Sequence, residues 1–288
     1  MTEKWILITG VSSGIGLDAA RHLCALNNNV IGTVRKLDDK KKLEAQLPDR
    51  FHCILLDVTN KNQIAEGIKE VDRILGGKKL DCLVNNAGIV KPGPLELIRD
   101  EDFEHQMDVN VSGVRNMTNA CLPFMYQNDD KRKSKIIFIS SVSGLFAAPF
   151  NGAYCISKHA LECMVDIYRR ELMIYKIDCI AIQPGPVKSK IWEKTIGTFE
   201  PYLNSQYGHI AHKADRIIQS SEKNALPVEF ISKKIQKVIE SAKPRTRYMV
   251  HTNKIGVKLL SGWIPDRIVD KMIWKSLNKK GTTKYRPV

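Results

Sequence analysis

The sequence predicts an α/β protein built on one parallel sheet with helices on both faces. Short apolar segments of strand length alternate along the chain with segments whose apolar residues recur at helical spacing. The strand candidates are apolar along almost their whole length, which is typical of strands buried on both faces. A glycine-rich turn directly follows the first of them. Together these observations indicate a doubly wound, Rossmann-type sheet in a single domain.

Seven segments have the length and composition of strands. They are 5–9 (WILIT), 29–34 (NVIGTV), 51–58 (FHCILLDV), 82–88 (CLVNNAG), 135–141 (KIIFISS), 178–185 (DCIAIQPG) and 247–252 (RYMVHT). Between the third and the fourth, apolar residues recur at helical spacing at Ile64, Ile68, Val71 and Leu75. The charged segment 127–135 is interpreted as a surface loop before the fifth strand.

The length of 288 residues suits one large domain with a full core. We expect this domain to span residues 1–252, followed by a basic C-terminal extension over residues 253–288. No basic segment with a long apolar run opens the chain, and nowhere do 18 apolar residues run together, so neither a signal peptide nor a spanning helix is predicted. Seven scattered cysteines without a C-x-x-C motif or metal-ligand spacing predict buried thiols in a reducing, cytoplasmic compartment and no metal site.

The first predicted strand leads into the turn TGVSSGIG, residues 9–16, and then into an apolar helical pattern. Glycines permit a tight turn and a close backbone approach, and the start of a helix presents unpaired N–H groups to an anion. A strand, a glycine-rich turn and a helix in this order predict a dinucleotide pyrophosphate site. The residues expected to form it are Gly10, Ser12, Ser13, Gly14, Ile15 and Gly16.

Arg35 and Lys36 follow the second predicted strand, where an acid would accept the ribose 2′-hydroxyl of NAD. A guanidinium can pair with a 2′-phosphate, so these residues favour NADP(H) over NAD(H). The alternative is that both are solvated loop charges.

In YCISK, residues 154–158, Tyr154 and Lys158 are four residues apart. On a helix this spacing places both side chains on one face, one turn apart. The spacing by itself is also found on ordinary amphipathic helices, where the Lys is solvated and the Tyr is packed.

Six motifs in a fixed order resemble those of the short-chain dehydrogenase/reductase family, in particular its retinol and hydroxysteroid dehydrogenase branches. They are TGVSSGIG, NNAG (85–88), Asn110 in MDVNVSG, ISSVSG (139–144), YCISK and PGPVKS (184–189), and the pattern covers residues 5 to about 250. The resemblance implies an oxidoreductase that transfers a hydride at nicotinamide C4, with NADP(H) favoured as the cofactor by Arg35 and Lys36.

The resemblance also implies the catalytic roles. Tyr154 is expected to be the general acid or base, with Lys158 lowering its working pKa toward neutrality by Coulomb attraction and binding the nicotinamide ribose. Ser141, thirteen residues before Tyr154, is expected to hydrogen-bond the substrate oxygen. Because neighbouring strand residues face opposite sides, we expect only one of Ser140 and Ser141 to address the site. Asn110 is expected to hold a proton-relay water beside Lys158 or, alternatively, to kink or cap a helix.

Further cofactor contacts are implied by the same resemblance. Asp57 is expected to contact the adenine, the NNAG segment the adenosine ribose, and the PGPVKS segment the nicotinamide. The residues so implied are Asp57, Val58, Asn86, Ala87, Gly88, Pro184, Gly185, Val187 and Ser189, together with Tyr154 and Lys158.

Residues 190–227 correspond to the family's variable substrate loop and are rich in apolar and aromatic residues. This composition suits a hydrophobic alcohol or carbonyl of retinoid, steroid or fatty-chain type, whereas the alternative is that the side chains pack the loop against the protein. The residues concerned are Ile191, Trp192, Ile196, Phe199, Tyr202, Leu203 and Tyr207. A broad-range carbonyl reductase remains open, as does a non-catalytic nicotinamide sensor or scaffold. Relatives in this family are commonly dimers or tetramers, so a homo-oligomer is expected.

The formal net charge of +14 is concentrated in the C-terminal part of the chain. From residue 231 onward, fifteen lysines and arginines face three acidic residues, a local net charge of +12. Within residues 256–281, apolar residues alternate with basic ones at a helical period. Such a helix can lie on an anionic membrane, but we expect it instead to dock over the substrate cleft or a second subunit. No nucleic-acid reading motif accompanies the charge.

Overall fold

The computed structural model describes residues 3–126, 133–189, 195–223 and 225–277. Seven parallel strands form one sheet in the order β3-β2-β1-β4-β5-β6-β7. This arrangement confirms the predicted doubly wound fold. The strands are β1 (Trp5–Ile8), β2 (Asn29–Val34), β3 (Phe51–Leu55), β4 (Cys82–Asn85), β5 (Lys135–Ile139), β6 (Asp178–Pro184) and β7 (Arg247–Val250).

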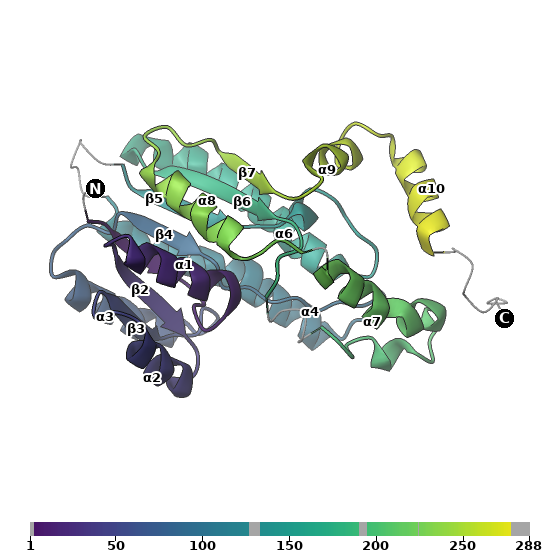
Figure 1. Cartoon of the computed structure of the whole chain (residues 1–288), viewed down its shortest axis with the longest axis horizontal. Coiled ribbons are helices and arrows are strands. Elements are labelled where there is room, and N and C mark those ends of the chain that lie inside the picture. The colour runs from purple at the N-terminus through teal and green to yellow at the C-terminus, as the bar shows by residue number, and fades with distance from the viewer. Residues whose placement is uncertain (1–2, 127–132, 190–194, 224, 278–288) are drawn as a thin grey trace.

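Helices cover both faces of the sheet, because alternate strand residues point to opposite sides (Figure 1). Ile6 and Ile8 of β1 pack in the core shared with α1 (Gly14–Ala25), α2 (Leu37–Gln46) and α8 (Glu229–Glu240). Leu7 belongs to the core on the other face, which is shared with α3 (Lys61–Leu75), α5 (Gly113–Cys121) and α6 (Gly152–Glu171). The sheet is therefore buried between two hydrophobic cores.

Several predicted strands end earlier in the structure than the apolar pattern suggested. β1 ends at Ile8, β4 at Asn85 and β5 at Ile139, before the polar residues that close each segment. Those residues leave the ladder at the carboxyl edge of the sheet. The direction of strand order reverses there between β1 and β4, and such a switch point leaves room for a ligand between the two loops.

The remaining helices lie around the carboxyl edge and beyond β7. α4 (Asp100–Met107) continues through a π turn (Asp108–Ser112) into α5, and 3-10 turns occur at 122–124, 142–144, 172–175 and 200–202. α7 (Gly208–Lys223) belongs to the 190–227 segment, while α9 (Lys254–Leu260) and α10 (Asp266–Leu277) follow β7 at the margin of the molecule (Figure 1). Among the helices that the structure describes, none combines the length and hydropathy needed to cross a bilayer.

The cysteines are free thiols, and Cys163 is exposed although we expected all seven to be buried. The other six are buried, and burial raises the pKa of thiols such as Cys53 and Cys121 to about 12. These buried thiols are therefore packing groups and not nucleophiles.

Candidate active site

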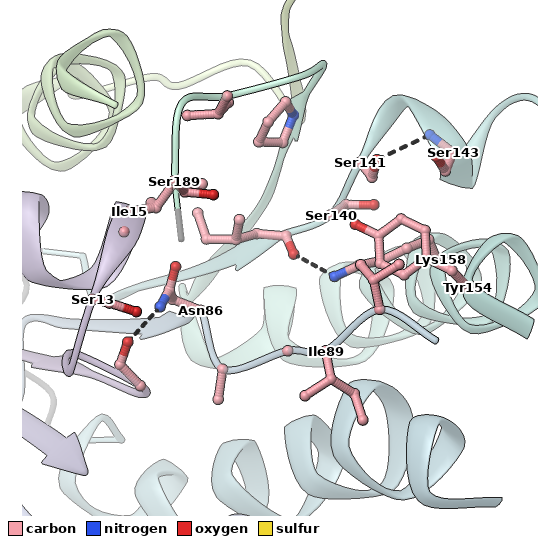
Figure 2. A pocket seen from close by; sticks show the side chains of 18 of the residues that line it. Ser13, Ile15, Asn86, Ile89, Ser140, Ser141, Ser143, Tyr154, Lys158 and Ser189 are labelled. Carbon is pink, nitrogen blue, oxygen red and sulfur yellow. Dashed lines mark hydrogen bonds between the residues drawn. The ribbon is translucent and has the colours of Figure 1, made fainter. Parts of the chain in front are cut away.

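A cavity of about 450 Å³ opens at the carboxyl ends of the central strands. Of the site residues predicted from the sequence, all but Gly16, Lys36, Asp57 and Asn110 line it. The lining side chains form two groups in Figure 2: Ser13, Ile15, Asn86 and Ser189 toward one end, and Ser140, Ser141, Tyr154 and Lys158 toward the other. The glycine-rich turn and the Ser141–Tyr154–Lys158 group thus share one cavity.

The glycine-rich turn between β1 and α1 is folded by hydrogen bonds from the neighbouring strands. Gly10 has a φ of +73°, a conformation that favours glycine, and its N–H donates to Thr33 Oγ1 at 3.2 Å. Asn86 Nδ2 donates to the carbonyl oxygens of Thr9 and Gly10 at 2.9 and 3.0 Å. The turn is therefore held with the N-terminus of α1 facing the cavity, and this cradle fits a pyrophosphate.

Gly16 lies behind the turn rather than in the cavity wall. A Cβ added there would overlap the Gly10 carbonyl oxygen and lie 2.5 Å from Asn86 Nδ2. Gly16 therefore allows α1 to start close against the turn, so its contribution to the dinucleotide site is indirect.

Replacing Gly16 with alanine should lower the free energy of unfolding by about 1–3 kcal/mol, because the added methyl must displace backbone. The same displacement should weaken dinucleotide binding. Thermal denaturation and a fluorescence titration with NADPH measure the two effects. Gly262→Ala is the matched control, since nothing lies within 4 Å of a Cβ added there. Equal melting temperatures for the two variants would contradict the close approach of α1 to the turn.

Arg35 and Lys36, which follow β2 and were predicted to favour NADP(H), differ in their position relative to the cavity. Arg35 lines the cavity, with Nη1 4.0 Å from Asp57 Oδ2. Lys36 is exposed and precedes α2 outside the cavity. Asp57 does not line the cavity either, and its Oδ1 accepts hydrogen bonds from the backbone N–H and hydroxyl of Thr59 at 2.9 and 2.8 Å. Arg35 is thus the basic group of this pair that a 2′-phosphate in the cavity can reach.

Tyr154 and Lys158 lie one turn apart on α6, as their spacing predicted. Lys158 Nζ is 5.6 Å from the centroid of the Tyr154 ring and donates to the Ile139 carbonyl oxygen at 2.9 Å (Figure 2). Lys158 is 5% exposed, so the end of β5 holds its ammonium group within the protein. The helix and the strand together fix the two side chains side by side.

The pKa of Tyr154 differs in direction from the expectation. Burial raises the pKa of Tyr154 to about 12, while a hydrogen bond with Ser141 acts in the lowering direction. Burial lowers the pKa of Lys158 to about 8, and the carboxylate of Glu162 raises it. Desolvation of the charged form is the largest cause for both side chains. Tyr154 is a neutral phenol at neutral pH.

Ser140 and Ser141 both contribute to the cavity wall, but the Ser140 hydroxyl oxygen is buried, so the choice of the serine that addresses the substrate stays a prediction. The alternation of side chains applies within a strand, and β5 ends at Ile139. Ser141 caps the following 3-10 turn by accepting a hydrogen bond from the Ser143 N–H at 3.1 Å (Figure 2). The Ser140 hydroxyl oxygen is buried without a hydrogen-bond partner among the described residues.

Asn110 lies in the π turn, fully buried and outside the cavity lining. Its Oδ1 accepts from the Ile89 N–H at 2.9 Å, and its Nδ2 donates to the Ile89 carbonyl and to Ser157 Oγ, both at 3.0 Å. The side chain thus ties the segment after β4 to α6. This contact differs from the helix kink or cap that was the alternative, and a part in proton relay stays a prediction.

The segment after β6 closes the cavity from the opposite side. Pro184, Gly185, Val187 and Ser189 line it, and hydrogen bonds of 2.8 and 2.9 Å pair this segment with Leu226. A Cβ added to Gly14 would lie 3.3 Å from Ser189 Cβ, so the segment after β6 reaches the phosphate-binding turn.

The described aromatic residues of the 190–227 segment pack against the protein and do not line the cavity. Phe199 and Tyr202 are buried in a small core with Leu97 and Phe150, and Tyr207 donates to Glu96 Oε2 at 2.8 Å. Thr195 is the only described residue of this segment that lines the cavity. Ile196 and Leu203 are also absent from the lining, while Ile191 and Trp192 lie outside the described residues. The packing interpretation therefore holds for the described aromatic residues.

Several lining residues were not predicted from the sequence. They come from strand ends and loops: Thr33, Val34, Leu56, Ile89, Val90, Ile139, Ser140, Val142, Ser143, Asn151, Pro186 and Thr195. Many directly adjoin a predicted motif. Their position at or just after the end of a buried strand is the sequence signal that could have identified them. Their apolar members give the cavity a mixed wall suited to an organic ligand. In the described part of the chain, no group of His, Cys, Asp and Glu could hold a metal ion.

A doubly wound sheet, a phosphate-binding turn and a Ser–Tyr–Lys group in one cavity define the class of nucleotide-dependent oxidoreductases. The short chain dehydrogenase model matches residues 4–198. The chain therefore belongs to the short-chain dehydrogenase family and is an NAD(P)-dependent oxidoreductase.

Individual relatives agree with this assignment over nearly the whole chain. An NADPH-dependent 3-dehydrocapnine reductase from Ornithobacterium rhinotracheale is 37% identical over 277 residues, which cover 96% of this chain and 98% of the relative. Human retinol dehydrogenase 16 is 29% identical over 293 residues, covering 96% and 90%. A short-chain dehydrogenase structure from Streptomyces avermitilis has a TM-score of 0.77 at 24% identity, covering 96% and 97%, and shows the shared fold.

Proposed function

We propose that this chain reduces the carbonyl group of a hydrophobic substrate, of retinoid, steroid or fatty-chain type, with NADPH as the electron donor. The observation that carries the proposal is that Ser141, Tyr154 and Lys158 share one cavity with the glycine-rich turn, and the relative named as a reductase supports the direction. Tyr154 is a phenol that carries its proton at neutral pH. A group that donates a proton is what carbonyl reduction requires. The NADPH-dependent Ornithobacterium relative supports the choice of cofactor.

When bound, NADPH supplies the hydride for the reaction. The chain's own residues hold the substrate and move the proton. Ser141 and Tyr154 hold the substrate oxygen between their hydroxyl groups, and Tyr154 gives its proton to that oxygen. Lys158, charged below a pKa of about 8, stabilises the phenolate that proton donation leaves behind. The buried surroundings exclude water and so strengthen this attraction.

A spectrophotometric assay of NADPH oxidation tests the proposal. Apolar aldehydes and ketones are compared with small polar carbonyls at matched concentrations. We expect higher kcat/KM values for the apolar compounds. Tight NADPH binding without turnover of any carbonyl would favour a sensor or scaffold, while equal turnover of all of them would favour a broad-range reductase. Light scattering measures whether the chain is the homodimer or homotetramer that we propose.

Replacing Arg35 with alanine should raise KM for NADPH by roughly 10–100-fold, because a charge-assisted contact to the 2′-phosphate is lost. KM for NADH should change little, since NADH lacks that phosphate. Steady-state kinetics with each cofactor measure both values. Lys36→Ala is the matched control, because Lys36 is the adjacent basic residue but does not line the cavity. A wild-type preference for NADH would overturn the cofactor assignment.

A further inference from the structure

The two helices after β7 expose apolar side chains to an unusual extent. Of residues 253–277, Val269 alone is buried. α9 and α10 lie at the margin of the molecule in Figure 1, beyond the end of β7. The large apolar residues exposed on and between them include Ile255 (75%), Leu259 (42%), Trp263 (82%), Ile268 (51%) and Met272 (50%). An apolar surface of this kind needs a partner.

The exposed apolar residues follow one pattern in both helices. In KIGVKL (254–259) and RIVDKM (267–272), a basic residue directly precedes each of two apolar residues that are four positions apart. Residues four apart share a helix face, so each helix presents an apolar pair. The basic residues Lys254, Lys258, Arg267 and Lys271 are all exposed beside these pairs.

The substrate cleft of the same chain is not the partner in this structure. No residue of the described part of the extension, 253–277, lines the cavity, although we expected this segment to dock over the cleft or a second subunit. The extension nevertheless begins close to the cavity. The ring of His251 packs against Gly185, which lines the cavity wall.

The charge of the exposed surface indicates what kind of partner fits it. Residues 253–277 carry five basic side chains and two acidic ones, Asp266 and Asp270. Apolar side chains flanked by lysine and arginine match an anionic lipid surface, where the apolar groups enter the acyl region and the cations meet the headgroups. A tryptophan as exposed as Trp263 suits the boundary between these layers.

We propose that α9 and α10 form a membrane-contact surface that places the cavity entrance beside an anionic lipid bilayer. The Ile255–Leu259 and Ile268–Met272 pairs insert, and the four preceding basic residues bind the headgroups. This surface would act whatever substrate the cavity accepts.

Vesicle flotation of the full chain tests the proposal. Vesicles of phosphatidylglycerol and phosphatidylcholine are compared with vesicles of phosphatidylcholine alone. We expect the bound fraction to be larger on the anionic vesicles and to fall with added salt. Replacing Ile255, Leu259, Ile268 and Met272 together with serine should lower anionic vesicle affinity by at least about ten-fold. Ile174→Ser is the matched control, because Ile174 is 74% exposed but lies outside the extension.

Three outcomes separate the possible occupants. Loss of flotation in the quadruple variant, with unchanged circular dichroism and unchanged flotation of the Ile174→Ser protein, supports the proposal. Failure of the wild-type chain to float with either vesicle overturns it. A quadruple variant that changes from oligomer to monomer by light scattering, while the wild type does not float, would instead assign the surface to a second copy of the chain.

Discussion

Replacing Tyr154 with phenylalanine should lower kcat for carbonyl reduction by about 10²–10⁴-fold, the range that a positioned general acid contributes. The phenyl ring preserves the packing of the buried side chain and removes only the hydroxyl that donates the proton. Cofactor binding should change little, because the hydroxyl acts chiefly in the transition state. Single-turnover kinetics and a fluorescence titration with NADPH measure the two quantities separately.

Tyr168→Phe is the matched control for this substitution. Burial also raises the pKa of Tyr168 to about 12, but its hydroxyl donates to Asn119 Oδ1 at 2.6 Å and does not line the cavity. This variant should keep wild-type kcat even if its stability is reduced. Retention of most activity in Tyr154→Phe would remove Tyr154 from its proposed role, and a loss of NADPH binding would point to a structural effect.

The rate of carbonyl reduction should fall as the pH rises through about 8, where Lys158 loses its charge. Without that charge the phenolate left on Tyr154 is no longer stabilised, so proton donation becomes harder. Lys158→Met should lower kcat/KM by at least about 100-fold at neutral pH for the same reason. The pH dependence of kcat/KM between about pH 6 and pH 10 measures the alkaline limb.

Substitution of Glu162 tests whether the alkaline limb of the kcat/KM pH profile reports the titration of Lys158. Its carboxylate, one turn further along α6, raises the pKa of Lys158, so Glu162→Gln should move the limb to lower pH. Glu162 also pairs with Arg247 at 2.8 Å, as does Asp166 at 2.9 Å. Asp166→Asn therefore controls for the disturbance of Arg247 and should leave the limb in place. A limb that moves equally in both variants would contradict the assignment to Lys158.

The fold could be predicted from the sequence because its signals are local. Apolar runs, helical spacing and the turn at Gly10 each act over a few residues, and their alternation defines the doubly wound sheet. The ends of strands were less well predicted, since the predicted fifth strand included Ser140 and Ser141 whereas β5 stops at Ile139. This difference also explains why Ser140 joined Ser141 in the cavity wall.

The candidate site could be predicted from the sequence only where the residue types and their spacing along the chain together indicated a function. Tyr154 and Lys158 were placed by their spacing, but the direction of the Tyr154 pKa depends on burial by segments far away in the chain. Tertiary structure also decides whether an aromatic side chain contacts a ligand or packs against other residues of the protein. Tyr202 packs against Gly93, more than a hundred residues earlier, and composition alone could not indicate this contact.

The buried ammonium of Lys158 also has a thermodynamic consequence for the fold itself. Its pKa is lowered from 10.5 to about 8, so the unfolded chain binds this proton more tightly than the folded chain does. At neutral pH this preference opposes folding by on the order of 3 kcal/mol. This free-energy penalty has its full size below about pH 8 and declines as the pH rises toward 10.5. The packing of the two cores must outweigh this penalty, and a lysine held at this position for catalysis, as proposed, therefore destabilises the native state at neutral pH.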